Sequence, residues 1–391
     1  MRRCLAVILL TTSLSVIAQT RHPISKIEFH SRIPTSILLT QSALSENRTY
    51  TDADLDLAAA RLRRLPFVYY VNYTIDGTTA IFEIADEYRG FFHVDTLARQ
   101  STGGPGDNGF LSGELGGRYY LPWGGTAQAT YGASSVIGSS AYTFQYSQYG
   151  LARTRLYFIV DASRPRSGGT QPHYEIGYPL TLRQSITLTG SRRQSSDSES
   201  SGINNHFTSD SVQHDMELAW QWNTTNDPLF ATRGAAFLVG RGRTKEENHA
   251  LSVSGTRVIF SNDSKTDSDY WHAGVGKFWP VGRGAFTANA DAKWFDETRH
   301  SRSRSTDPFA VTGQNERTTS ATAGWVHDFF KSVSELTASR RRVELAIGIQ
   351  TYDFKARGIT TRQNFKNMQA GYAFRNRWGN VHFVLSYLER Y

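Results

Sequence analysis

Side chains alternate between apolar and polar along many short segments of residues 89–391. The pattern is clearest over 286–294, and the segments 216–222 and 343–350 repeat it. In the first of these segments the apolar members are Phe286, Ala288, Ala290, Ala292 and Trp294. A period of two is typical of a strand whose two faces meet different solvents. No run of about 18 apolar residues occurs, which excludes a helical membrane protein. A soluble all-β protein or a membrane barrel with a wet interior remains.

The composition favours the barrel. Hydrophobic residues make up 39% of the chain, aromatic residues 13%, and there are 33 glycines. This balance is typical of a barrel with aromatic girdles. The net charge of +8 comes from Lys and Arg residues that are spread along the chain. Because they form no concentrated basic face, we expect no nucleic acid partner. The positive charge suits anionic lipid headgroups, so membrane lipids are an expected partner.

The first residues are typical of a secretory signal. Arg2 and Arg3 precede a short apolar run over 5–10, and small residues follow it. We therefore predict a signal peptide over 1–18 that is removed on export. Cys4 is the only cysteine of the chain. The mature chain would then contain no thiol, so we expect no disulfide and no cysteine metal site.

Residues 19–88 follow a different pattern and predict a small α+β domain. Thr51 and Asp54 form a capping pair, and Asp76-Gly77 is a favourable tight turn between two strands. The expected order is β-α-α-β-β: a strand over 24–29, a helix over 34–44, a second helix from Thr51 to Pro66, and strands over 67–75 and 79–84. Two helices can cover one face of the resulting three-stranded sheet.

Two short motifs of this domain resemble a known module. Residues 62–68 read Leu-Arg-Arg-Leu-Pro-Phe-Val, and residues 82–87 read Phe-Glu-Ile-Ala-Asp-Glu. Both, with the element order, are similar to a POTRA domain, the periplasmic module of the BamA/TamA outer-membrane assembly superfamily. The resemblance covers the mature chain through several such short matches, so the chain resembles a divergent member of that family.

The barrel region carries further matches. Residues 226–234 are similar to the family's periplasmic turn, with Ala231 where the family has proline. The segments 121–125 and 371–379 resemble an early turn and a late glycine-aromatic strand. The turn residues that the resemblance marks are Asp227, Pro228, Thr232, Arg233 and Gly234.

The resemblance implies a fold and a function. The fold is mainly β: a transmembrane antiparallel β-barrel of about 16 strands over 89–391, preceded by the POTRA domain in the periplasm. The expected location is the cell outer membrane. The expected function is to assist the insertion, assembly or translocation of other proteins, with unfolded barrel or secreted proteins as clients and accessory lipoproteins as partners of the POTRA domain. In the family, a client strand adds to a weak seam, here between 89–100 and 379–391.

One departure from the family concerns its sixth extracellular loop. That loop carries an Arg-Gly-aromatic triplet, which residues 296–317 lack. The triplet at 89–91 lies at the domain junction, and we interpret it as a coincidence. The candidate loop and lumen residues are Asp291, Lys293, Gly313, Arg317 and Glu344. A solvated network of luminal ion pairs is the alternative for Asp291, Lys293 and Glu344. The alternative function is a passive channel or a structural barrel without insertase activity, and a transporter for one dedicated partner is a third possibility.

The strand count depends on residues 244–267. Sixteen crossings fit residues 89–391, an even number as bacterial single-chain barrels have. If 244–267 is one long loop, the count falls to fifteen. The last strand carries a candidate insertion signal formed by Phe383, Leu385, Tyr387 and Tyr391. An ordinary amphipathic final strand would show the same alternation.

We expect no enzyme, no cofactor and no metal. The chain contains no nucleophile elbow, no phosphate-binding glycine loop and no His-Glu-x-x-His pair. Asp52, Asp54 and Asp56 imitate the start of a calcium loop, but Leu57 stands where that loop needs glycine. Sequence leaves open a lipase with Ser and His assembled at the barrel rim.

Overall fold

The structure is a computed structural model. It describes residues 20–390 except for 88–89, 103–109, 122, 135–139, 166–168, 201–204, 228–230, 255–256, 296–301, 306–312, 330–339 and 357–358. The predicted signal peptide, Pro228 and Tyr391 lie outside the described residues. Within the described part, no helix is long and apolar enough to cross a membrane.

The N-terminal domain has the predicted order of elements with two short strands added. Its elements are β1 (Arg21–Ile24), β2 (Lys26–His30), α2 (Thr35–Ser42), β3 (Arg48–Thr51), α3 (Asp52–Leu62), β4 (Val68–Asp76) and β5 (Thr79–Asp86). The three-stranded sheet has the order β2-β5-β4, with β2 parallel and β4 antiparallel to β5. The added strands, β1 and β3, pair with each other in a separate two-stranded sheet.

Helix α3 begins where the sequence predicts and ends earlier. The Asp54 backbone N–H donates to Thr51 Oγ1 at 3.2 Å, and the Thr51 N–H donates to Asp54 Oδ2 at 3.1 Å. This reciprocal capping box fixes the first turn. We expected Pro66 to end the helix, but it ends at Leu62. A proline disfavours helical geometry in the residue before it, so the chain leaves the helix upstream.

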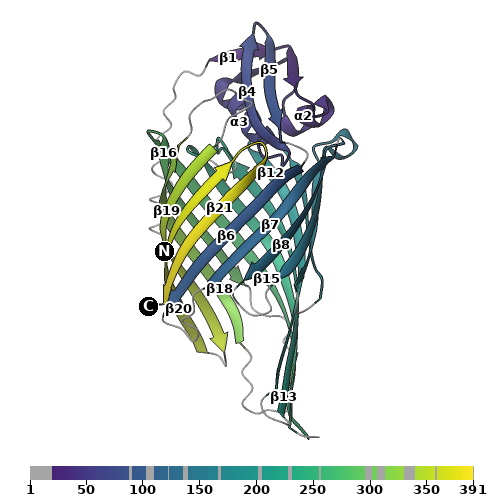
Figure 1. The fold of residues 1–391 in the computed structure, drawn as a ribbon, viewed down its shortest axis with the longest axis vertical. Coiled ribbons are helices and arrows are strands. Elements are labelled where there is room, and N and C mark those ends of the chain that lie inside the picture. Colours follow the sequence, from purple (N-terminus) through teal and green to yellow (C-terminus); the bar gives the residue numbers. More distant parts are fainter. Residues whose placement is uncertain are drawn as a thin grey trace.

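Fifteen strands form a closed barrel below the domain (Figure 1). They are β6 (Gly90–Thr102), β7 (Phe110–Leu121), β8 (Gly125–Ser134), β9 (Ala141–Tyr149), β10 (Tyr157–Pro165), β11 (Gln171–Pro179), β12 (Gln184–Ser200), β13 (Asn205–Asn223), β14 (Gly234–Ser254), β15 (Arg257–Val281), β16 (Gly284–Phe295), β18 (Gly313–Asp328), β19 (Arg340–Ala356), β20 (Ile359–Arg375) and β21 (Gly379–Arg390). A one-turn 3₁₀ helix (Leu151–Arg153) lies between β9 and β10, and β17 (Arg302–Ser305) pairs only with the outer part of β15.

The count of sixteen was wrong, and the alternative of fifteen is confirmed. Residues 244–267 contain no extra crossing, because β14 and β15 pair continuously from Gly234–Phe278 to Ser254–Arg257. The alternation of polar and apolar residues continues into this hairpin. A period of two identifies strands, but it does not show how many times they cross a bilayer. The odd number has a direct consequence. The first strand, β6, and the last strand, β21, run in the same direction and pair in parallel, while the other neighbours in the barrel wall are antiparallel.

Strands β12 to β15 extend far beyond the barrel wall, away from the N-terminal domain (Figure 1). β15 has 25 residues, about 80 Å at about 3.3 Å per residue, whereas the hydrocarbon core of a bilayer is about 30 Å thick. β15 is therefore too long to lie within such a core over its whole length. The polar residues 195–200 belong to β12, and residues 302–305 form β17.

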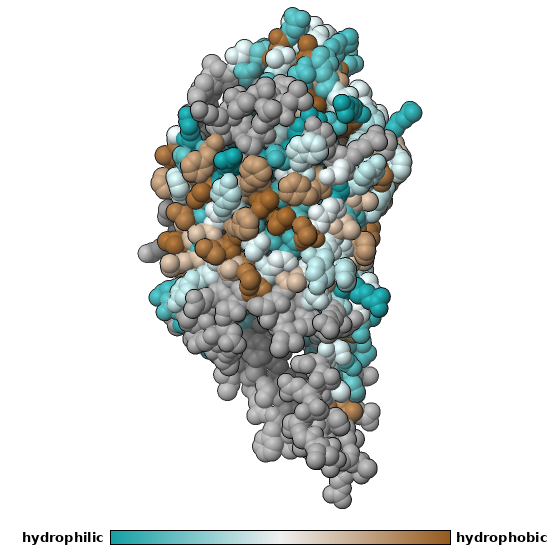
Figure 2. Space-filling model, viewed as in Figure 1, coloured by the Kyte–Doolittle hydropathy of each residue, from teal (hydrophilic) through white to brown (hydrophobic). Residues whose placement is uncertain are grey.

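The two faces of the barrel wall differ as the alternation predicts. Large apolar side chains point outward, and Phe286, Ile347 and Leu385 are 54%, 64% and 64% exposed. Figure 2 shows such residues gathered over the middle of the barrel, with hydrophilic residues above them toward the domain. Charged residues at the intervening positions face the interior and bind one another there, as His272 does with Asp291. An apolar outside around a polar inside is the arrangement that a membrane barrel requires.

Candidate functional site: the seam and its clamp

The parallel pairing of β6 with β21 closes the barrel, and we call it the seam. It runs through eleven residue pairs, from Phe92–Gly379 to Thr102–Glu389. Parallel pairs are slightly less stable per residue than antiparallel ones. On the inner face, two pairs of side chains span the seam: Asn380 Nδ2 lies 2.9 Å from His93 Nδ1, and His382 Nδ1 lies 3.6 Å from Asp95 Oδ2.

A buried carboxylate joins the strands on both sides of the seam at the end nearest the domain. Glu87 follows β5 and precedes β6, and its side chain is 2% exposed. Arg118 of β7 donates to Glu87 Oε2 at 3.0 Å, and Arg375 of β20 donates to Glu87 Oε1 at 2.5 Å. We call these three residues the clamp. Because β7 flanks β6 and β20 flanks β21, the clamp holds the seam from both sides.

Neighbouring contacts fix the clamp in place. Arg375 also donates to Val68 O at 3.1 Å, and Arg377 donates to Asp86 O at 3.1 Å. Phe91 is buried, and the Arg118 guanidinium lies 4.8 Å from its ring centroid. Burial raises the pKa of the Glu87 carboxyl above its ordinary value, and the two clamp arginines oppose that rise.

The domain also packs on the mouth, by which we mean the barrel end that faces it. The ring of Phe67 lies 4.7 Å from that of Tyr120 in β7 and 5.8 Å from that of Tyr149 in β9. Both tyrosines belong to the hydrophobic core of the domain. Ile37 of α2 contacts the β7–β8 turn at Gly124, where an added Cβ would lie only 2.4 Å from Ile37 Cδ1. The domain is thus a cap that shares its core with the barrel.

Polar contacts extend the cap around the mouth. Each of these contacts joins a side chain of the domain, in or next to α3, to a turn of the barrel. The contacts are Arg61 to Thr181 O at 2.9 Å, Arg63 to Asn226 O at 2.9 Å, Arg183 to Asp54 at 3.2 Å and Arg233 to Asp56 at 2.5 Å. Burial lowers the pKa of the Arg61 guanidinium to about 10, as expected where a cation loses water.

The family-like turn 226–234 lies within this interface. Asn226 organises it, because its Oδ1 accepts from the backbone N–H of Thr232 at 3.0 Å and of Arg233 at 3.1 Å. Burial lowers the pKa of Arg64, and the nearby buried carboxylate of Asp227 opposes that change. The turn reaches across the mouth, since Arg342 of β19 donates to its Ala231 O at 2.9 Å.

Gly234 ends this turn with φ +106°, and an added Cβ would lie 2.3 Å from Thr224 O. We expect Gly234→Ala to lower the free energy of unfolding by about 1–3 kcal/mol, the usual cost of such backbone strain. Denaturant unfolding in detergent measures this change. The matched control is Gly113→Ala, where an added Cβ has ordinary contacts. An equal effect of both substitutions would contradict the strain at Gly234.

The candidate lumen residues separate into two groups. Asp291 and Lys293 join one network: His272 bridges Asp291 at 2.8 Å and Glu217 at 2.9 Å, and Lys293 Nζ lies 3.5 Å from the ring centroid of Tyr270. Arg317 lies opposite Trp294, next to Lys293 in the register of β16 with β18, while Glu344 and Gly313 lie elsewhere on the wall. Glu344 pairs with Gly371, Gly313 with Ala356, and Arg317 with Asp353. The five residues do not form one site, and the network agrees with the solvated ion-pair alternative.

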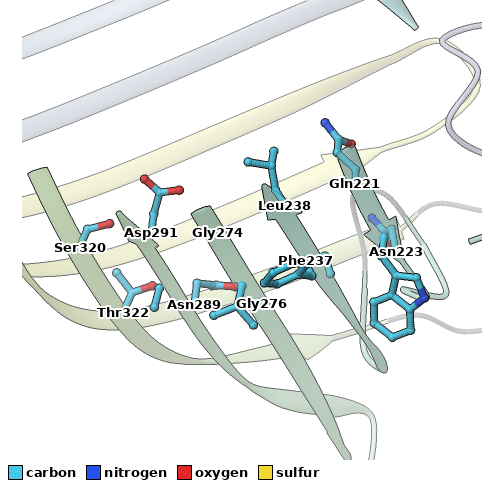
Figure 3. A pocket seen from close by; sticks show the side chains of 14 residues that line it. Gln221, Asn223, Phe237, Leu238, Gly274, Gly276, Asn289, Asp291, Ser320 and Thr322 are labelled. Carbon is cyan, nitrogen blue, oxygen red and sulfur yellow. The ribbon is translucent and has the colours of Figure 1, made fainter. Parts of the chain in front are cut away.

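A shallow cavity of about 330 Å³ lies on the inner wall beside this network (Figure 3). Gly274 and Gly276 project no side chain there, and amide and hydroxyl groups surround them. Its polar lining includes Gln221, Asn223, Asn289, Asp291, Ser320 and Thr322. Among the described residues, no group of three or more His, Cys, Asp or Glu side chains could hold a metal ion.

The candidate C-terminal signal lies on β21. Phe383 and Leu385 are 47% and 64% exposed and point outward, as an amphipathic strand predicts. β21 runs away from the domain (Figure 1), so its end lies at the far rim of the barrel. Whether these residues act as a signal stays a prediction.

Sequence reasoning missed the clamp and Asn226. Glu87 lies in a motif that resembles the family, but its partners are 31 and 288 residues away. Nothing local marks Arg118 or Arg375. The position of Glu87 directly before the first barrel strand is the only signal that could have identified it.

Comparison with known proteins gives no family. No protein-family profile and no curated protein sequence matches the chain. Among solved structures, BamA from Haemophilus ducreyi lacking POTRA domains 1–3 is 12% identical and aligns over 90% of this chain and 82% of its own, with a TM-score of 0.39. CdiB from Acinetobacter baumannii is 11% identical over 91% of this chain and 64% of its own, with a TM-score of 0.40. CdiB from Escherichia coli is 10% identical over 90% and 72%, with a TM-score of 0.41. These values assign neither a family nor a function. The fold and the site define the chain as a capped β-barrel with an apolar outer wall.

Proposed function

We propose that the chain is an outer-membrane barrel that assists the insertion, assembly or translocation of other proteins, with its cap a POTRA-type domain in the periplasm. The seam is the observation that carries this proposal. A passive barrel gains most from a continuous wall, because an open edge in lipid leaves backbone groups unsatisfied. This barrel instead closes with a parallel pairing, next to a charged clamp.

The physical basis is β-augmentation. When the seam opens, β6 and β21 each present a free row of backbone N–H and C=O groups, and an unfolded client strand can pair with them. β6 contains Asp95 and Ala98 near its centre, and both residue types are depleted in strands. In the cap, β2 and β4 each pair on one side only within the described residues, so accessory lipoproteins or clients have an edge to bind there. This role needs no catalytic residue or cofactor.

A reversible lock of the seam tests the proposal. Thr96 and Phe383 are partners across the seam, so Thr96→Cys with Phe383→Cys should form a disulfide under oxidation. We expect the oxidised protein in liposomes to lose most of its ability to assemble an added unfolded barrel protein, and a reductant to restore it. Assembly is measured as the fraction of client that becomes protected from protease.

The matched control locks a different pair of strands. Ala129 and Phe144 are partners between β8 and β9, also a small residue and a phenylalanine. A disulfide between Ala129→Cys and Phe144→Cys should leave assembly unchanged. Full activity of the seam-locked protein would contradict the proposal and would favour the passive channel or structural barrel.

A further inference from the structure

The direction of the two seam strands restricts what the seam can accept. β6 and β21 both run from the mouth toward the far rim, because the barrel has an odd number of strands. When the seam opens, the two free edges therefore have the same polarity. In a barrel with an even number of strands the two edges would have opposite polarity.

We propose that the seam accepts a single client strand, or an odd number of strands, that runs from the far rim to the mouth and pairs antiparallel with β6 and β21 together. This rests on the proposed function and specifies its substrate. In an up-and-down insert with an odd number of strands, the first and last strands run in the same direction. The first strand of the insert can then pair antiparallel with one seam strand, and its last strand can pair antiparallel with the other. An even insert leaves one parallel junction, and antiparallel pairing is the more stable of the two.

The dimensions of the seam specify the strand. Its eleven residue pairs match the roughly 9–11 residues of a strand that crosses a bilayer at a tilt. Outward positions along the seam carry Phe383 and Leu385, and inward positions carry Asp95 and His382. The inserted strand therefore alternates apolar and polar residues. Its carboxyl end reaches the mouth, beside Gly379 and Phe92.

Insertion is coupled to the clamp. One added strand increases the spacing between β6 and β21 from about 4.8 Å to about 9.6 Å. Glu87 contacts Arg118 and Arg375 at 3.0 and 2.5 Å, so it cannot keep both after that displacement. The clamp must therefore open when the first strand enters.

Synthetic peptides with one, two or three copies of the same eleven-residue amphipathic strand, joined by tight turns, test this. Each carries a terminal cysteine and is added to the full chain in detergent micelles. Cysteines are placed at two pairs of seam partners. Ala98→Cys and Leu385→Cys lie farther toward the far rim, and Val94→Cys and Val381→Cys lie nearer the mouth. Disulfide yield is measured with each variant separately.

We expect the one-strand and three-strand peptides to crosslink to both edges about tenfold more than the two-strand hairpin. With a single strand, an amino-terminal cysteine should react at Ala98→Cys and Leu385→Cys, and a carboxyl-terminal cysteine at Val94→Cys and Val381→Cys. Preference for the hairpin, reaction with one edge only, or the reversed orientation would overturn the inference and leave the proposed function standing. No reaction by any peptide would overturn both.

Discussion

Replacing Glu87 by glutamine should lower the free energy of unfolding by about 3–5 kcal/mol, the usual effect of removing one partner from a buried ion pair. The amide keeps the shape of the side chain but leaves the guanidinium groups of Arg118 and Arg375 buried without their carboxylate. Urea unfolding of the protein in detergent measures the change. Because the clamp joins both sides of the seam, the same substitution should increase the yield of crosslinks between an added peptide strand and the seam cysteines.

Glu83→Gln is the matched control. Glu83 lies on β5 of the same domain and binds His30 at 2.6 Å, but its side chain is 39% exposed. Pairs of this kind contribute about 0–1 kcal/mol. If Glu87→Gln destabilises the protein no more than this control, the clamp does not hold the seam.

Replacing Phe67 by alanine should release the cap from the mouth. The ring is 1% exposed and contacts Tyr120 and Tyr149 of the barrel, so its removal costs about 3–5 kcal/mol. In planar bilayers, the unaltered protein should show little steady conductance because the cap covers the mouth, and Phe67→Ala should show a persistent increase.

Phe29→Ala separates loss of the cap contact from a general loss of domain stability. Phe29 packs on Phe82 inside the same domain, with ring centroids 5.5 Å apart. It should destabilise the domain without opening the pore. A high steady conductance in the unaltered protein would contradict the cap and would support the channel alternative.

Local patterns predicted the local structure. The Thr51–Asp54 capping box and the alternation over 286–294 each depend on residues within one element, and both are confirmed. Side-chain direction in a strand follows from parity alone, and Asp291 contacts His272 of the neighbouring strand.

Features that depend on distant partners could not be predicted in this way. The predicted strand count depended on whether residues 244–267 cross the membrane. The polar residues of this segment are compatible with a strand in water and equally with a strand that lines a lumen. The clamp joins residues from the domain, β7 and β20, which only the closed barrel brings together. Asn226 organises its turn through hydrogen bonds that its sequence neighbours do not reveal.

The shared core of cap and barrel has a consequence for biogenesis. Tyr120 and Tyr149 complete the hydrophobic core of a domain that precedes them in the chain. The amino-terminal segment leaves the ribosome first, yet its interior can become fully dry only after the strands that follow have assembled in the bilayer. Until then its exposed apolar surface needs protection, and a chaperone would have to stay with this segment longer than with an autonomous domain.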